Sequence, residues 1–179
     1  MSIAPIWYFA YGSNMQRATF CGRRGLECLR AVPARAVGWR LVFDKPGLIP
    51  IDEAYANVVP EPGTETFGVA YEITADDLAH VELTEGVLIG NYRRVEIAIT
   101  ALGEPDVTLA ACTLVSDRRD AGLRPSDRYM ACVIAGAEEH ALPRSWIDFL
   151  RGVPARPQSS TAAALRPFID QAFLRPKKP

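Results

Sequence analysis

The chain has 179 residues, a length at which one hydrophobic core can bury most of the apolar surface, so we expect no second independent core. Hydrophobic residues make up 49% and charged residues 23%, which excludes wholesale disorder. Because 20 Lys and Arg nearly balance 21 Asp and Glu, no strong net field draws in nucleic acid or an anionic membrane. The composition favours small-molecule partners.

The apolar pattern, the N-terminal residues and the cysteines indicate the cellular location of the protein. No apolar run reaches the length of a membrane span, and residues 1–5 lack the charged and apolar regions of a secretory signal. We therefore expect a cytoplasmic protein. The four cysteines form no C-x-x-C pair, and no histidine stands at zinc-ligand spacing: Cys21, Cys28, Cys112 and Cys132. We expect reduced thiols and no metal, with Cys112 and Cys132 packed as small hydrophobic side chains rather than acting as nucleophiles.

The first part of the chain predicts two strands and two loops. Ile6 to Tyr11 is an aromatic, apolar run that stops at a Gly-Ser-Asn turn, typical of a buried strand and a tight loop. A helical stretch from Met15 to Phe20 follows. Val37 to Phe43 is a second strand. The Pro- and Gly-containing stretch from Lys45 to Glu53 reads as a connection, and it has the composition of a segment able to move as a lid.

The middle of the chain predicts hairpins and a capped helix. Tyr55 to Val59 and Thr66 to Ile73 are strand-like and are separated by residues rich in Pro and Gly, which indicates an antiparallel hairpin. Thr74 to Asp77 has the form of a helix N-cap, and Gly86 would end that short helix. Glu85 therefore lies at a helix terminus.

A second pair of strands precedes the late helices. Tyr92 to Thr100 alternates between apolar and polar residues, and Val107 to Val115 follows after a short turn, which predicts another hairpin. Helical spacing begins after Ser126 and again near Pro143, and Ser159 to Leu174 predicts a last helix interrupted at Pro167. Strands first and helices later indicate an α+β domain with a mixed, mainly antiparallel sheet curled into a small barrel.

The turn after the first strand is a candidate anion site. Tyr8 to Met15 places a bend without side-chain bulk between a strand and a helical stretch, which exposes successive backbone N–H groups. Such a nest binds a carboxylate. The alternative is a plain strand-to-helix turn in which Ser13 or Asn14 caps the helix.

Three segments, in this order, resemble the γ-glutamylcyclotransferases and related AIG2-like proteins. Tyr11 to Asn14 is similar to the signature loop of that family, and Glu85 to Tyr92 is similar to its catalytic glutamate segment. Pro125 to Ala137 resembles its tyrosine-bearing helix. The resemblance covers about Ile6 to Leu150, so it implies a γ-glutamylcyclotransferase-like domain over residues 1–152, with a partly helical extension, 153–179, packed on the same domain.

The resemblance also implies an activity and its residues. It indicates an enzyme that closes a γ-glutamyl group into 5-oxoproline and releases an amine, with Glu85 as general acid and base and without a cofactor. We expect Val87, Leu88 and Ile89 to shield that carboxylate from water. The implied substrate-binding residues are the loop residues and two tyrosines: Tyr11, Gly12, Ser13, Asn14, Tyr92 and Tyr129.

Two other classes of function compete with this interpretation. A noncatalytic protein would use the same pocket to bind a metabolite, although Glu85 argues against it, because a binding module needs no carboxylate at that position. A partner-binding role for the late helices depends only on Trp146 and Phe149. Within the enzyme hypothesis, the sequence leaves open the amine released and the oligomeric state. Glutathione is a secondary candidate to a γ-glutamyl dipeptide or amine.

Overall fold

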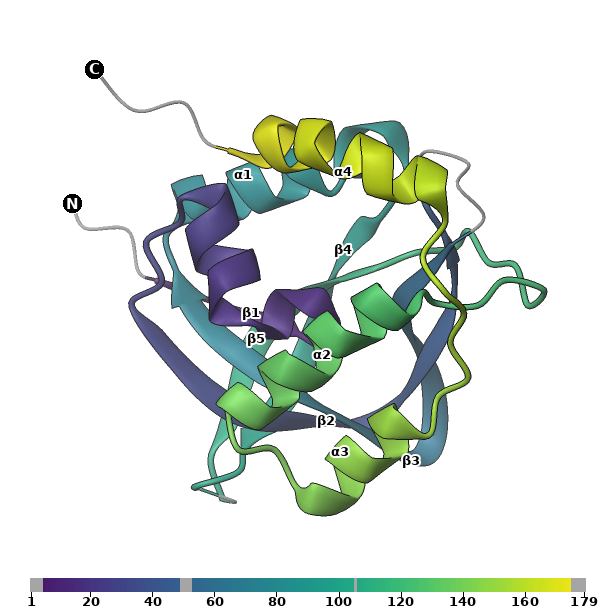
Figure 1. Cartoon of the computed structure of the whole chain (residues 1–179). Helices are drawn as coiled ribbons and strands as arrows, with labels where there is room; N and C mark the ends of the chain where they lie inside the picture. Colours follow the sequence, from purple (N-terminus) through teal and green to yellow (C-terminus); the bar gives the residue numbers. More distant parts are fainter. Residues whose placement is uncertain (1–4, 49–52, 105, 175–179) are drawn as a thin grey trace.

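Five strands close into a barrel in the computed structural model, which describes residues 5–48, 53–104 and 106–174 (Figure 1). The strands lie in the order β1-β3-β2-β4-β5: β1 (Ile6–Ala10), β2 (Arg30–Pro46), β3 (Ala54–Ile73), β4 (Arg93–Ala101) and β5 (Thr108–Val115). Strand β1 pairs with β5 in parallel, and every other pair is antiparallel. The expected mixed, mainly antiparallel barrel is therefore confirmed.

The expected hairpin between Tyr55 and Ile73 is wrong, because that whole stretch is one 20-residue strand, β3. Strand β2 runs beside it for 17 residues, from the Arg30–Glu72 pair to the Pro46–Ala54 pair. A register shift between Val37 and Trp39 lets the two long strands bend while staying paired. The Pro- and Gly-containing residues that suggested a turn are accommodated by this irregularity.

The second expected hairpin is confirmed as β4 and β5, whose register runs from Arg93–Val115 to Thr100–Thr108. Ile97 and Ile99 are buried and Ala98 between them is exposed, as alternation predicts. The expected 45–53 connection is only partly described. Lys45 and Pro46 belong to β2, and residues 49–52, on which the lid hypothesis depends, lie outside the described residues.

Helices follow the loop after β1 and cover the barrel late in the chain. They are η1 (Ser13–Met15, 3-10), η2 (Ala18–Gly22, π), α1 (Ala75–Thr84), η3 (Val87–Ile89, 3-10), α2 (Asp127–Glu139), α3 (Arg144–Arg151) and α4 (Ser160–Phe173). The expected interruption at Pro167 is wrong, because α4 is continuous through it. Figure 1 shows α4 beside α1, and the His80 ring nitrogen lies 3.0 Å from the Phe173 carbonyl oxygen.

The expectation of four reduced thiols is also wrong, because Cys21 and Cys28 form a disulfide. The chain turns back after η2 and brings their Cα atoms to 6.0 Å, within the range that a disulfide spans. Their seven-residue separation resembles no common motif, so the spacing of these cysteines does not indicate a bond. Cys112 is a buried free thiol on β5, as expected, whereas Cys132 is only half-buried on α2.

The core fixes the position of the loop after β1. Phe20 of η2 stacks on Tyr8 of β1, with ring centroids 5.1 Å apart, and lies 4.7 Å from the Tyr71 ring on β3. The Tyr71 hydroxyl donates a 2.6 Å hydrogen bond to the Met15 carbonyl at the end of η1. Burying these aromatic rings contributes to stability and holds both short helices against the barrel.

Candidate active site

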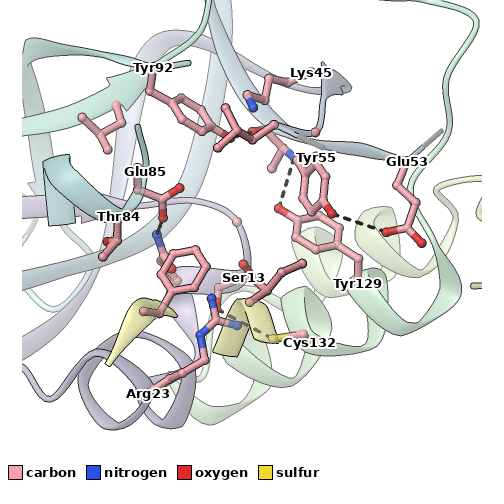
Figure 2. Close-up of a pocket in the computed structure, with 18 of the residues that line it drawn as sticks. Ser13, Arg23, Lys45, Glu53, Tyr55, Thr84, Glu85, Tyr92, Tyr129 and Cys132 are labelled. Carbon is pink, nitrogen blue, oxygen red and sulfur yellow. Dashed lines mark hydrogen bonds between the residues drawn. The ribbon is translucent and has the colours of Figure 1, made fainter. Parts of the chain in front are cut away.

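A cavity of about 360 Å³ opens where the loop after β1, the end of α1, the facing ends of β2 and β3, the start of α2 and one face of α4 meet (Figure 2). All seven residues that the sequence singled out line this cavity: Tyr11, Gly12, Ser13, Asn14, Glu85, Tyr92 and Tyr129. They come from segments up to 118 positions apart in the chain, from Tyr11 to Tyr129. The fold therefore brings the three resembling segments together.

Local helix geometry places Glu85. Thr74 accepts a 3.1 Å hydrogen bond from the Asp77 N–H group and begins α1, as its capping pattern predicts. Glu85 is the C-cap of α1, and Gly86 adopts the left-handed conformation with φ 74° that ends the helix. The backbone turns sharply at Gly86, and the Glu85 side chain lines the cavity.

The surroundings of Glu85 differ from those expected. Leu88 and Ile89 are 84% and 69% exposed, so they do not shield its carboxylate from water. The carboxylate instead forms an ion pair with Arg24, whose side chain is 1% exposed, and Oε1 accepts a 3.0 Å hydrogen bond from Asn14 Nδ2. The Glu85 carboxylate is therefore held in the cavity by a buried guanidinium and by the Asn14 amide.

Arg24 is the main residue that sequence reasoning missed, because a lone Arg-Arg pair is usually solvated surface. Its guanidinium donates to Asn14 Oδ1 at 2.8 Å and to Thr84 Oγ1 at 3.2 Å, besides the Glu85 carboxylate. The Phe173 ring of α4 lies 4.8 Å from its guanidinium carbon. Asn14 is thus fixed from two sides, by Arg24 and by Glu85. This network makes the Glu85 carboxylate rigid.

Lys45 is a second missed residue, at the end of β2. It is 2% exposed, and its ammonium donates to Asn91 Oδ1 at 2.7 Å and lies 4.5 Å from the Tyr92 ring. Asn91 Nδ2 in turn donates to the Glu85 carbonyl at 2.8 Å. Burial lowers the pKa of Lys45 from 10.5 to about 8, although the nearby Glu85 charge opposes that shift. The two residues hold the backbone of Glu85.

The loop after β1 is shaped by Tyr129 of α2. The Tyr129 hydroxyl oxygen accepts a 3.1 Å hydrogen bond from the Ala56 N–H group. Burial raises the pKa of Tyr129, and hydrogen bonds from the Ala56 and Ser13 N–H groups oppose the shift. A Cβ atom on Gly12 would lie 2.9 Å from the same oxygen, so the close approach requires glycine. Tyr129 therefore engages part of the expected amide nest.

The other two tyrosines of the predicted set are anchored to the barrel. The Tyr11 hydroxyl donates to the Leu114 carbonyl on β5, and the Tyr92 hydroxyl lies 3.5 Å from the Ala56 carbonyl oxygen. Burial raises the pKa of both phenols, so both remain neutral hydrogen-bond donors near pH 7. Tyr11 and Tyr92 therefore contribute aromatic, uncharged surface to the cavity.

A second group of polar residues lies at the other end of the cavity. It consists of the charged residues Glu53, Arg128 and Arg166 and the neutral Tyr55, and we call it the Glu53 end. Glu53 is 4% exposed, and its Oε2 atom accepts a long 3.4 Å hydrogen bond from the Tyr55 hydroxyl. Figure 2 shows Glu53 and Glu85 on opposite sides of the drawn pocket. Sequence reasoning placed Glu53 in a loop and missed it.

Known proteins share this sequence and architecture. A model of the AIG2-like family matches residues 65–150. The γ-glutamyl cyclotransferase gliK of Aspergillus fumigatus is 28% identical, over 96% of this chain and 71% of that protein. The γ-glutamylcyclotransferase of Bos taurus is 27% identical, over 82% of this chain and 77% of that protein. The chain is similar to AIG2-like proteins and to γ-glutamylcyclotransferases over most of its length.

Solved structures agree with this family fold. A structure titled γ-glutamyl cyclotransferase superposes with a TM-score of 0.76 at 20% identity and covers 93% of this chain and 99% of its own. YkqA from Bacillus subtilis superposes with a TM-score of 0.72 at 25% identity, over 86% of this chain and 57% of its own. The first structure covers 93% of this chain, and the uncovered part is shorter than the extension 153–179. The common fold therefore includes part of that extension.

Two further observations bear on the expectations. None of the helices in the described ranges is long and apolar enough to cross a membrane. Trp146, one basis of the partner-binding alternative, is half-buried, and its ring centroid lies 5.4 Å from that of Phe67 on the barrel. Phe149 is 46% exposed and packs on Trp146.

Proposed function

We propose that this protein is a γ-glutamylcyclotransferase that converts a γ-glutamyl dipeptide or γ-glutamyl amine to 5-oxoproline and a free amine. The observation that carries the proposal is the Glu85 carboxylate, held rigidly in the cavity beside the Tyr11–Asn14 loop in a chain similar to these enzymes. No step of the proposed reaction needs a cofactor, because nucleophile and electrophile belong to the same substrate molecule.

The geometry of Glu85 suits a proton carrier. Asn14 and Arg24 both contact Oε1, and no hydrogen bond from a described residue to Oε2 is present, so Oε2 is free to meet the substrate. In the proposed mechanism Glu85 removes a proton from the substrate α-ammonium group, and the amine then attacks the γ-carbonyl carbon. Glu85 next protonates the departing amine as the C–N bond breaks. The carboxylate then takes the second proton from the ring nitrogen and passes it to the released amine, which leaves as an ammonium group, so that Glu85 returns to its starting state.

We propose that the backbone of Tyr11, Gly12, Ser13 and Asn14 holds the γ-glutamyl group, with Tyr92 and Tyr129 orienting it. Because the Tyr129 oxygen already accepts from the Ala56 N–H group, its own proton is available for a substrate oxygen. Holding the chain in attack geometry supplies an effective molarity on the order of 10⁵ M or more in well-aligned cases. Proton transfer contributes about 10²- to 10⁴-fold.

We also propose that the extension 153–179 belongs to the same folded unit as residues 1–152 and forms a cavity wall. Ile169, Ala172 and Phe173 of α4 line the cavity, and Asp170 forms a 3.1 Å ion pair with Arg23. This arrangement attaches α4 to the segment that carries Arg24.

The test is release of 5-oxoproline from a panel of γ-glutamyl dipeptides, γ-glutamyl amines and glutathione. We expect release by the wild type and a loss of at least about 100-fold in kcat/KM for Glu85→Gln, which keeps the side-chain size and removes the base. Glu96→Gln is the matched control, since Glu96 is an exposed carboxylate on β4 outside the cavity lining. Equal rates in Glu85→Gln and wild type would refute the assignment of Glu85.

A further inference from the structure

We propose that Glu53 and Tyr55 form a leaving-group subsite that receives a cationic nitrogen. This inference rests on the proposed function, and it narrows the substrates to γ-glutamyl amides whose amine part carries a second, protonated nitrogen. Glu53 immediately precedes β3, and Tyr55 is the second residue of that strand, so the rigid barrel edge positions both side chains.

The Glu53 carboxylate has an unsatisfied hydrogen-bond acceptor, as expected of a residue that binds a ligand. Its side chain is 4% exposed, and Oε1 is buried without a hydrogen-bond partner among the described residues. Among the described residues, the other oxygen, Oε2, accepts one hydrogen bond, the long 3.4 Å bond from the Tyr55 hydroxyl. A buried carboxylate oxygen without a partner is destabilising, and buried polar groups are nearly always satisfied in folded proteins. A cationic N–H donor in the cavity would satisfy Oε1.

The two cavity carboxylates act on separate parts of the site. The Glu85 charge contributes to raising the pKa of Tyr8, Tyr11 and Tyr92, whereas the Glu53 charge contributes, after burial, to raising the pKa of Tyr55 to about 12. In Figure 2, Tyr55 and Tyr129 lie between Glu85 and Glu53. A substrate with its γ-glutamyl group beside Glu85 therefore extends its amine part toward Glu53.

Arg128 and Arg166 line the cavity at the Glu53 end. Neither forms a direct ion pair with Glu53 in the described part of the chain. Arg166 Nε lies 2.9 Å from Asp170 Oδ1, an oxygen that also pairs with Arg23, so Arg166 is directed toward that shared carboxylate. Arg128 is exposed, and solvent screens an exposed charge. Burial makes Glu53 the stronger determinant of which charge the subsite accepts.

The test compares three γ-glutamyl amides of matched length: those of diaminobutane, pentylamine and aminopentanoate, which end in an ammonium, a methyl and a carboxylate group. We expect the wild type to favour the ammonium amide by about 10-fold or more in kcat/KM. Glu53→Gln should remove most of that preference while leaving the methyl amide within about 2-fold. Glu96→Gln, on the exposed side of β4, should change none of the three ratios.

Two results would overturn the subsite: a wild type without preference for the ammonium amide, or a Glu53→Gln variant that loses activity equally on all three. The wild-type comparison remains decisive even if Glu53→Gln fails to fold. Absence of 5-oxoproline from every amide would refute the proposed function instead. Calorimetric titration of wild type with the same three amides then decides the subsite by itself, because tighter binding of the ammonium amide supports it and equal binding refutes it.

Discussion

The two ends of the cavity are built in opposite ways. At the Glu85 end, which consists of Glu85, Asn14, Arg24 and Asn91, the side chains are hydrogen-bonded to one another or to the backbone. At the Glu53 end, a buried carboxylate oxygen is without a partner in the described chain. The Glu85 end is preorganised, which suits a reaction common to all substrates. The Glu53 end has a hydrogen-bond acceptor that only a group of the substrate would satisfy.

Removing Arg24 should produce the largest change, because it breaks the most connected residue of the Glu85 end. Arg24→Met leaves the Glu85 carboxylate without its ion pair, and losing one partner of a buried pair costs about 3 kcal/mol or more. We expect a loss of about that size in the free energy of unfolding, measured by urea denaturation, and a fall of about 100-fold in kcat/KM as the base loses its position.

A matched control and a double variant sharpen this result. Arg144→Met removes an exposed i,i+4 ion pair with Asp148 and should cost less than about 1 kcal/mol. The double variant Arg24→Met, Glu85→Gln should lose less free energy of unfolding than the two single variants lose together, since no unpaired charge then remains. Additive effects would show that the ion pair does not couple these residues.

Opening the disulfide should have the next largest effect, because Arg23 and Arg24 lie within the loop that Cys21 and Cys28 close. Cys28→Ser should lower the free energy of unfolding by about 2 kcal/mol under oxidising conditions, by releasing a short closed loop in the unfolded chain. Under reducing conditions the wild type should lose the same amount and match the variant. A wild-type stability that does not respond to reductant would contradict the bond.

The last prediction concerns Lys45, whose effect is absent near neutral pH and develops only at alkaline pH. Its folded pKa of about 8 lies below the ordinary 10.5, so between these values the unfolded chain binds more protons than the folded one. Stability relative to Lys45→Met should therefore rise with pH across that window, by at most about 1.4 kcal/mol per pH unit. Urea denaturation of both proteins at several pH values measures it, and a constant difference would argue against the buried charge.

The measurement compares the wild type with Lys45→Met because other groups titrate in the same pH range. Burial raises the pKa of Cys112 from 9.0 to about 11, so the folded thiol keeps its proton while the unfolded thiol loses it. That group makes stability fall as pH rises over its own window. Comparing the two proteins at each pH cancels this contribution, because both contain Cys112.

Local patterns determined much of this protein by themselves. The Thr74 cap, the Gly86 terminus and the alternation of Ile97 and Ile99 follow from short-range chemistry, and the structure has all three. The three resembling segments led to the family, and to seven residues that line one cavity. These features depend on neighbours within a few positions, or on motifs that are legible in one dimension.

Which charged residues are buried, and which groups they contact, depends on the packing of segments that are distant in the chain. Arg24, Lys45 and Glu53 look like ordinary surface residues in the sequence, because nothing in their neighbours shows that distant segments enclose them. The single strand β3 likewise depends on pairing along all of β2, which overrides its turn-like residues. Burial and pairing partners are set by contacts across the barrel, and a charge acquires its function when those contacts remove it from water.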